Sequence, residues 1–271
     1  MIRVVAAVAS LVTAAYIALC VAARLAYRRL LYPAPRVVLP ASLPEGAKRI
    51  VVHGLDGAED HAVWLPGHGA ATRTIVLFHG NGETIENSYP LADALNRRHL
   101  GVVLAEYRGY GVSAAAGPPS EAGLYGDAAA VLESLASQGV GPHQVVLLGI
   151  SLGTGVAAEM ARRGKGAALV LVSPYTSVTA MAERIAPLLP AAFVCPDRFD
   201  TIDKAASIRV PTLVVHGDAD EVIPFEMGRA VAGAIPAAVL HTVKGGHHND
   251  LFAAGSDTLV ERIAAHAFAA K

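Results

Sequence analysis

The chain has 271 residues, of which 53% are hydrophobic and 17% are charged, and its formal net charge is −1. This composition excludes a disordered chain, and the near-neutral charge without a basic stripe excludes a nucleic-acid-binding protein. Two isolated cysteines, Cys20 and Cys195, exclude a disulfide framework or a cysteine-based zinc site.

The N-terminal segment is long, apolar and uncharged. Residues 4–23 contain no charged side chain, and as a helix they would span about 30 Å, the thickness of a hydrocarbon core. Arginines flank this run at positions 3, 24, 28 and 29. The sequence predicts a single-pass membrane anchor over residues 1–30, with its orientation left open. A cleaved signal peptide and a helix of the soluble domain are the alternatives.

The next segment, residues 31–47, contains prolines at positions 33, 35, 40 and 44. Because proline interrupts helices, this segment is expected to form an extended connector. From residue 48 to the C-terminus, strand and helix patterns alternate, which predicts a doubly wound, mostly parallel α/β sheet. In chain order we expect an antiparallel pair at 48–57 and 61–67, strands at 73–80, 101–109, 144–149, 167–174, 211–217 and 237–243, and helices at 81–98, 121–138, 152–163, 224–234 and about 250–268. Residues 175–209 are broken by prolines and are interpreted as an irregular, short cap.

Residues 149–153 read Gly-Ile-Ser-Leu-Gly, the pattern G-x-S-x-G of a sharp turn between a strand and a helix. Such a turn exposes one serine hydroxyl, here that of Ser151. A serine hydroxyl is a weak nucleophile, so it needs a base, an acid that orients the base, and donors for an oxyanion. In a doubly wound sheet these groups are expected at the carboxyl ends of strands.

Candidates for the base and the acid follow the last two strands. His247 and His248 lie in a glycine-rich loop after 237–243, and three acidic residues follow 211–217: Asp218, Asp220 and Glu221. The chain order of serine, acid and histidine is typical of nucleophile-elbow hydrolases. The residues alone do not choose between the two histidines or among the three acids. His79 and His216 also end strands, and we interpret them as turn residues.

Two backbone N–H groups are predicted to hold the oxyanion. Leu152 follows the serine and opens a helix, whose N-terminus favours negative charge. The second group is assigned to Asn81, with Gly82 as the alternative, in the loop after the strand at 73–80. Tyr107 and Tyr175 are predicted to contact the substrate.

The motifs together resemble the α/β-hydrolase superfamily, and more narrowly its membrane-anchored branch with the Bem46-like proteins and α/β-hydrolase domain-containing proteins 13 and 17. The stretches that carry the resemblance are FHGNGE (78–83), EYRGYGVSAAAGPPSEAGLYGDA (106–128), LLGISLGTGVA (147–157), PTLVVHGDADEVIP (211–224) and GGHHND (245–250). The resemblance selects Asp220 as the acid and His248 as the base. Two residues depart from the pattern of the resembled family. Glu106 occupies a position where that family usually has aspartate, and His247 occupies a position where it usually has a small residue.

The resemblance implies a serine hydrolase that cleaves an ester or thioester through an acyl-enzyme on Ser151 and needs neither metal nor organic cofactor. A small-molecule or lipid ester is the expected substrate, and the membrane is the expected partner through the N-terminal helix. An aminopeptidase-like amide hydrolase and a non-catalytic scaffold on the same fold are the alternatives. The oligomeric state stays open.

Overall fold

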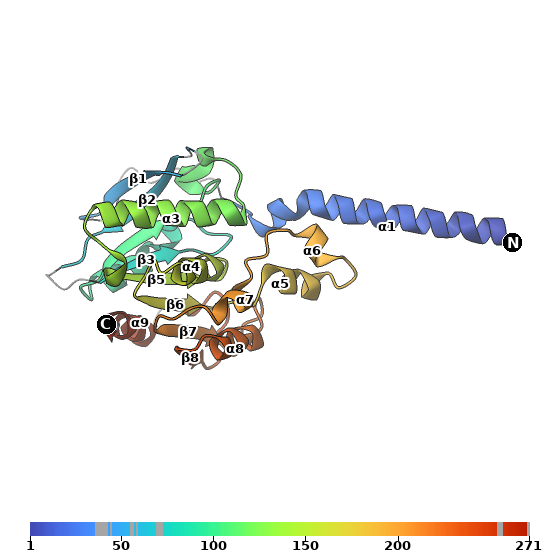
Figure 1. Ribbon diagram of the computed structural model, residues 1–271. Coiled ribbons are helices and arrows are strands. Elements are labelled where there is room, and N and C mark those ends of the chain that lie inside the picture. Colours follow the sequence, from blue (N-terminus) through green and yellow to red (C-terminus); the bar gives the residue numbers. More distant parts are fainter. Residues whose placement is uncertain are drawn as a thin grey trace.

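The computed structural model describes residues 1–35, 43, 45–54, 57, 59–68, 73–253 and 257–269 (Figure 1). The helices are α1 (Ile2–Leu31), α2 (Tyr89–Asn96), α3 (Glu121–Ser137), α4 (Gly153–Arg162), α5 (Val178–Ile185), α6 (Ala191–Val194), α7 (Thr201–Ala205), α8 (Phe225–Ala234) and α9 (Asp257–Ala269). The strands are β1 (Lys48–His53), β2 (Glu59–Leu65), β3 (Thr74–Phe78), β4 (Gly101–Ala105), β5 (Val145–Ile150), β6 (Ala168–Val172), β7 (Thr212–Gly217) and β8 (Ala238–Val243).

The strands form one eight-stranded sheet in the order β1-β2-β4-β3-β5-β6-β7-β8. β2 runs antiparallel to β1 and β4, and all other neighbours are parallel. The predicted antiparallel pair and the mostly parallel sheet are therefore confirmed. β3, β4, β5 and β6 lie in the middle of the sheet, and their almost continuous apolar sequences match strands that are covered on both faces.

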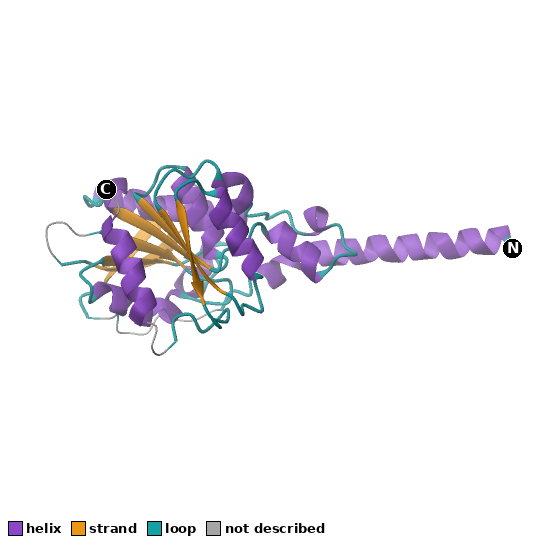
Figure 2. Cartoon of the chain, turned by 90° about the horizontal axis from the view of Figure 1, so that it is seen from below, coloured by secondary structure: helices purple, strands orange, loops and turns teal. Residues whose placement is uncertain are grey.

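Helices cover the two faces of the sheet, as Figure 2 shows. One core cluster lies between the sheet and the helices α3, α4 and α8, and the base of α1 packs into the same cluster. The second cluster lies on the opposite face, under α2 and α9. This doubly wound arrangement brings the carboxyl ends of β3, β5, β7 and β8 to one edge of the sheet, where the candidate residues follow.

The N-terminal helix α1 projects away from the rest of the molecule (Figure 1). Only 6% of its most apolar stretch is buried, so it is not a core helix of the domain. Its length and composition are sufficient to cross a membrane. Near the domain, Tyr27 and Tyr32 are buried, and both hydroxyls donate to the Asp197 carboxylate, at 3.4 and 2.9 Å.

Three segments differ from the sequence-based expectation. The region expected to be irregular contains α5, α6 and α7, because its prolines at 187, 190 and 196 fall between short helices. The last helix begins at Asp257 rather than near 250, since residues 250–253 form turns. Of the connector expected at 31–47, Leu31 still belongs to α1, and residues 36–42 and 44 lie outside the described residues.

Candidate active site

Ser151 lies in the turn between β5 and α4, with its backbone in the left-handed region at φ +50°. A non-glycine residue rarely adopts this conformation, so the turn is strained. A Cβ atom at Gly149 would collide with the carbonyl group of Gly153, and one at Gly153 would collide with the carbonyl oxygen of Phe78. The two glycines of the motif are required because the strand, the turn and the helix approach one another too closely for side chains.

The glycine requirement predicts a large difference between two Gly→Ala substitutions. Gly153→Ala should destabilise the fold by about 1–3 kcal/mol or more, since the new methyl group cannot be accommodated next to the β3 backbone. Gly126→Ala in α3 is the matched control, because no heavy atom lies within 4 Å of the added methyl group. This control should stabilise the protein by about 0.5–1 kcal/mol through helix propensity. Denaturant unfolding of both variants measures the difference; equal stabilities would contradict this account of the turn.

The side chains of Ser151, His248 and Asp220 form one hydrogen-bonded line. His248 Nε2 lies 3.1 Å from the Ser151 hydroxyl oxygen, and His248 Nδ1 lies 2.8 Å from Asp220 Oδ2. A carboxylate accepts only, so Nδ1 carries the proton and Nε2 is left to accept from the serine hydroxyl. The Asp220 side chain is fully buried and that of His248 is 10% exposed. This arrangement allows a proton to pass from the serine to the imidazole.

Asp220 is held as a carboxylate by its neighbours. Burial alone would favour the neutral acid, but hydrogen bonds from His216, His248 and the Ile223 N–H together hold the pKa of Asp220 well below its usual range. Oδ1 accepts the N–H groups of Val222 and Ile223 at 2.9 and 2.8 Å. The ionised carboxylate can therefore orient His248 and stabilise its imidazolium form.

The two adjacent histidines face different partners. The His247 side chain is 56% exposed, and its Nδ1 lies 3.0 Å from Glu221 Oε2. The hydrogen bond to Glu221 raises the pKa of His247, which favours the protonated ring and disfavours its use as a base. Asp218 is also turned away from the histidine ring, since its Oδ1 accepts the N–H of Gly245 at 2.6 Å. Asp220 and His248 are thus the pair that the fold brings to Ser151.

The predicted oxyanion donors lie in the two turns that border Ser151. Gly80, next to Asn81, approaches the serine side chain: a Cβ atom built there would be 3.6 Å from Ser151 Cβ. Within the described residues, the N–H groups of Asn81 and Leu152 donate no hydrogen bond. Both are therefore available to a ligand at the serine.

The hydroxyl groups of Tyr107 and Tyr175 form hydrogen bonds with the backbone of these two turns. The Tyr107 hydroxyl donates to the carbonyl oxygen of His79 at 3.0 Å, and that of Tyr175 donates to Leu152 at 3.1 Å. Both rings are almost fully buried, which raises the pKa of each phenol well above its usual value. The geometry therefore supports a positioning role for them instead of the predicted direct contact with substrate.

Two further histidines take part in the site in ways that the sequence analysis did not identify. His216 Nε2 lies 2.9 Å from the Ile223 carbonyl oxygen and 3.3 Å from Asp220 Oδ2, so this buried ring contacts the same carboxylate oxygen as His248. The signal was available, because His216 ends β7 four residues before Asp220. The sequence alone does not assign it this role, because a lone histidine gives no direction for its ring.

His79 and Glu106 form a fully buried pair under the loop that carries Asn81. His79 Nδ1 lies 2.8 Å from the Gly80 carbonyl oxygen, and Nε2 lies 2.8 Å from Glu106 Oε1. Since the carbonyl oxygen only accepts, Nδ1 is the donor in the hydrogen bond to Gly80. The Glu106 side chain reaches His79 directly and so fixes the start of this loop.

The C-terminal end of α1 also contacts this loop. The Asn81 side-chain amide donates to the Leu31 carbonyl oxygen at 3.3 Å, and the Gly111 N–H donates to the Pro35 carbonyl oxygen at 2.9 Å. The Tyr110 hydroxyl donates to the Asn81 carbonyl oxygen at 2.9 Å. The N-terminal helix is therefore joined to the segment that presents one of the two predicted oxyanion donors.

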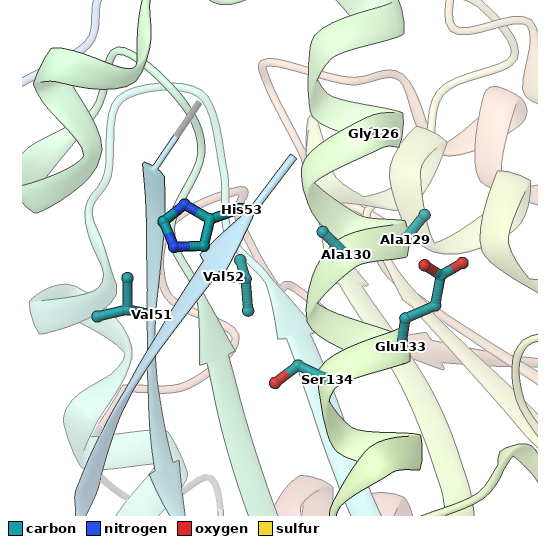
Figure 3. Close-up of a pocket in the computed structure, with 8 residues that line it drawn as sticks. All are labelled: Val51, Val52, His53, Gly126, Ala129, Ala130, Glu133 and Ser134. Atoms are coloured by element: carbon teal, nitrogen blue, oxygen red, sulfur yellow. The ribbon is translucent and has the colours of Figure 1, made fainter. Parts of the chain in front are cut away.

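One pocket of the described chain lies away from the candidate active site. It has a volume of about 280 Å³ and lies between β1 and α3, at the sheet edge far from β5 (Figure 3). Its lining combines small side chains with His53, Glu133 and Ser134, and none of the candidate active-site residues borders it. Among the described residues no group of three or more histidine, cysteine or acidic side chains is arranged to hold a metal ion.

Comparisons with known proteins bear on the family and the fold of this chain. The family described as "Serine aminopeptidase, S33" matches residues 69–195. An uncharacterized protein of Mycobacterium tuberculosis, Rv2307c, is 36% identical over 229 residues, which are 82% of this chain and 80% of that protein. The mouse α/β hydrolase domain-containing protein 17C is 36% identical over 181 residues, which are 66% of this chain and 55% of that protein.

Solved structures with the same fold include esterases. The Pyrococcus furiosus esterase Pf2001 superimposes with a TM-score of 0.69 at 19% identity, over 86% of this chain and 97% of that one. The Rhodococcus esterase RhEst1 gives a TM-score of 0.62 at 20% identity, over 82% and 99% of the two chains. These structures show the shared fold. Together with the family match over residues 69–195, the relatives that are 36% identical and the serine turn after β5, they identify the family: the chain belongs to the α/β-hydrolase superfamily.

Proposed function

We propose that this protein is a serine hydrolase that cleaves a carboxylic ester or thioester through an acyl-enzyme on Ser151. The observation that carries the proposal is the continuous line from the serine hydroxyl through His248 to Asp220, with distances of 3.1 and 2.8 Å. The strained backbone at Ser151 supports it, because the fold maintains an unfavourable conformation at the residue that begins this line.

In the proposed reaction Ser151 Oγ attacks the carbonyl carbon while His248 Nε2 takes the hydroxyl proton. Asp220 stabilises the imidazolium, and the N–H groups of Asn81 and Leu152 stabilise the oxyanion. When the tetrahedral intermediate collapses, His248 returns the proton to the leaving alcohol or thiol. Water, activated by the same imidazole, then attacks the acyl-enzyme and releases the carboxylic acid and the free serine.

An ester or thioester is the favoured substrate class because the similar solved structures include esterases. The uncharged, largely apolar run at 185–196 in the cap and the apolar helix α1 beside it favour a lipid or acylated substrate. The family description "Serine aminopeptidase" favours amide hydrolysis as the second candidate. Parallel assays with p-nitrophenyl esters and aminoacyl p-nitroanilides separate the two: faster turnover of the anilides would favour the second.

The proposal includes a membrane location. We assign residues 1–30 to a single-pass anchor, 31–47 to the connector and 48–271 to the hydrolase domain with its cap at 175–209. The mostly exposed, apolar surface of α1 supports an anchor, because a helix of this kind is not stable in water without a partner.

Labelling with a fluorophosphonate tests the enzyme without knowledge of its substrate. The reagent should attach covalently to Ser151, and peptide mapping should find the modification in the peptide that contains the turn at 149–153. Heat-unfolded protein is the control, because labelling requires the folded arrangement of the serine and histidine. A folded protein that takes up no label, or takes it up at another serine, would contradict the proposal in favour of a scaffold.

A further inference from the structure

The cap exposes three large apolar side chains to solvent. Ile185, Leu188 and Phe193 are 78%, 85% and 53% exposed, respectively. They lie at the end of α5, in the following loop and in α6. From Ile185 to Cys195 the sequence contains no charged side chain. We call residues 185–195 the cap tip. An uncharged, exposed apolar segment of this kind indicates a surface that is covered in the working protein.

The cap tip lies along α1. α6 packs against this helix, and both views place the loop between α5 and α6 beside the domain-proximal part of α1 (Figures 1 and 2). The Tyr16 hydroxyl donates to the Leu188 carbonyl oxygen at 2.8 Å. At the other end of the cap, Asp197 accepts from Tyr27 and Tyr32. The cap therefore follows α1 from its last turns toward its middle.

This register sets the depth of the cap tip relative to a membrane. The uncharged run of α1 ends at Ala23, and Tyr16 lies seven residues before that end (23 − 16 = 7). With the hydrocarbon boundary placed at Ala23, a rise of about 1.5 Å per residue puts Tyr16 roughly 10 Å inside it. Leu188, which is bonded to Tyr16, lies at the same level. Interfacial elements insert to comparable depths of about 5–10 Å.

The backbone of the cap tip is suited to a medium without water. The N–H groups of five residues donate to carbonyl oxygens three or four positions earlier: Ala186, Leu189, Phe193, Val194 and Cys195. Pro187 and Pro190 have no N–H group, and the Leu188 carbonyl oxygen is bonded to Tyr16. Among the described residues the N–H groups of Leu188, Ala191 and Ala192 donate no hydrogen bond. Because an unsatisfied backbone group is costly in hydrocarbon, the pairing of the other five N–H groups makes insertion less costly than it would be for an open loop.

We propose that the cap tip inserts into the leaflet that α1 enters beside it, so that the protein contacts the bilayer through two elements. The proposal rests on the membrane anchor of the proposed function. Lipid acyl chains are the occupant of the surface formed by Ile185, Leu188 and Phe193. Insertion holds the cap at the membrane, and the cap begins at Tyr175, which is bonded to Leu152 next to the serine. The active site then opens close to the lipid surface, where acyl-chain substrates reside.

The test uses the full-length protein in phosphatidylcholine vesicles with an environment-sensitive nitrobenzoxadiazole label on one introduced cysteine. Three variants are compared: Leu188→Cys in the cap tip, Val12→Cys in α1, and Val239→Cys on β8. Val12 and Val239 are matched in exposure, at 62% and 64%. The wild-type chain gives the background, since its two native cysteines are buried.

The labels at 188 and 12 should emit at shorter wavelength and be quenched by lipids with a spin label on the acyl chain, several-fold more than the label at 239. Quenching at 12 without quenching at 188 would overturn the insertion of the cap tip and leave the anchor intact. Quenching at neither position would overturn both, and quenching at 188 alone would overturn the anchor and, with it, the two-element contact proposed here. Hydrolysis of a water-soluble ester by the same samples reports the proposed reaction separately.

Discussion

Replacement of Ser151 by alanine should reduce kcat/KM for a short p-nitrophenyl ester by roughly 10⁴- to 10⁶-fold, the size of effect seen when a nucleophile is removed from a serine hydrolase. The reason is that the alanine methyl group can neither attack the carbonyl group nor accept the acyl chain. Turnover of the ester by purified protein, together with loss of fluorophosphonate labelling, measures the effect.

Ser173→Ala is a demanding control for this substitution. Ser173 also follows a strand, β6, and its backbone is also in the left-handed region, at φ +49°. Its buried hydroxyl group has no hydrogen-bond partner within the described residues. This variant should keep ester hydrolysis within a few-fold of the wild type. If Ser173→Ala were the inactive variant and Ser151→Ala retained turnover, the assignment of the nucleophile would be wrong.

Replacement of His248 by alanine should cost about as much as loss of Ser151, because the groups of such a line act as a unit. His247→Ala should leave kcat/KM within a few-fold of the wild type, since this ring is paired with Glu221 on the surface. The two variants differ by one position in the same loop, so shared effects on folding cancel in the comparison. Ester turnover of both variants shows which histidine is the base, and unfolding curves check that both variants are folded. An inactive His247→Ala variant with an active His248→Ala variant would assign the base to His247.

The sequence by itself determined the strands, their order and the helices outside the cap, but not the three short helices α5, α6 and α7. Alternating apolar runs and helical patterns predicted the mostly parallel sheet, because a strand covered on both faces must be apolar along its length. The glycines around Ser151 predicted the sharp turn, and chain order placed an acid and a histidine after the last two strands. The uncharged run at 4–23 predicted a long apolar helix, because a run of this length and composition leaves no polar face.

Directions of side chains and contacts between distant segments were decided only in the tertiary structure. Neighbouring residues such as His247 and His248 cannot be told apart by composition, and the turn after β8 directs one ring to Ser151 and the other to Glu221. The same holds for His216 and for the pair of His79 and Glu106, whose partners lie on other loops. The register of the cap along α1 depends on a contact between residues 16 and 188. Such pairings arise from the packing of the whole chain, and local sequence patterns do not predict them.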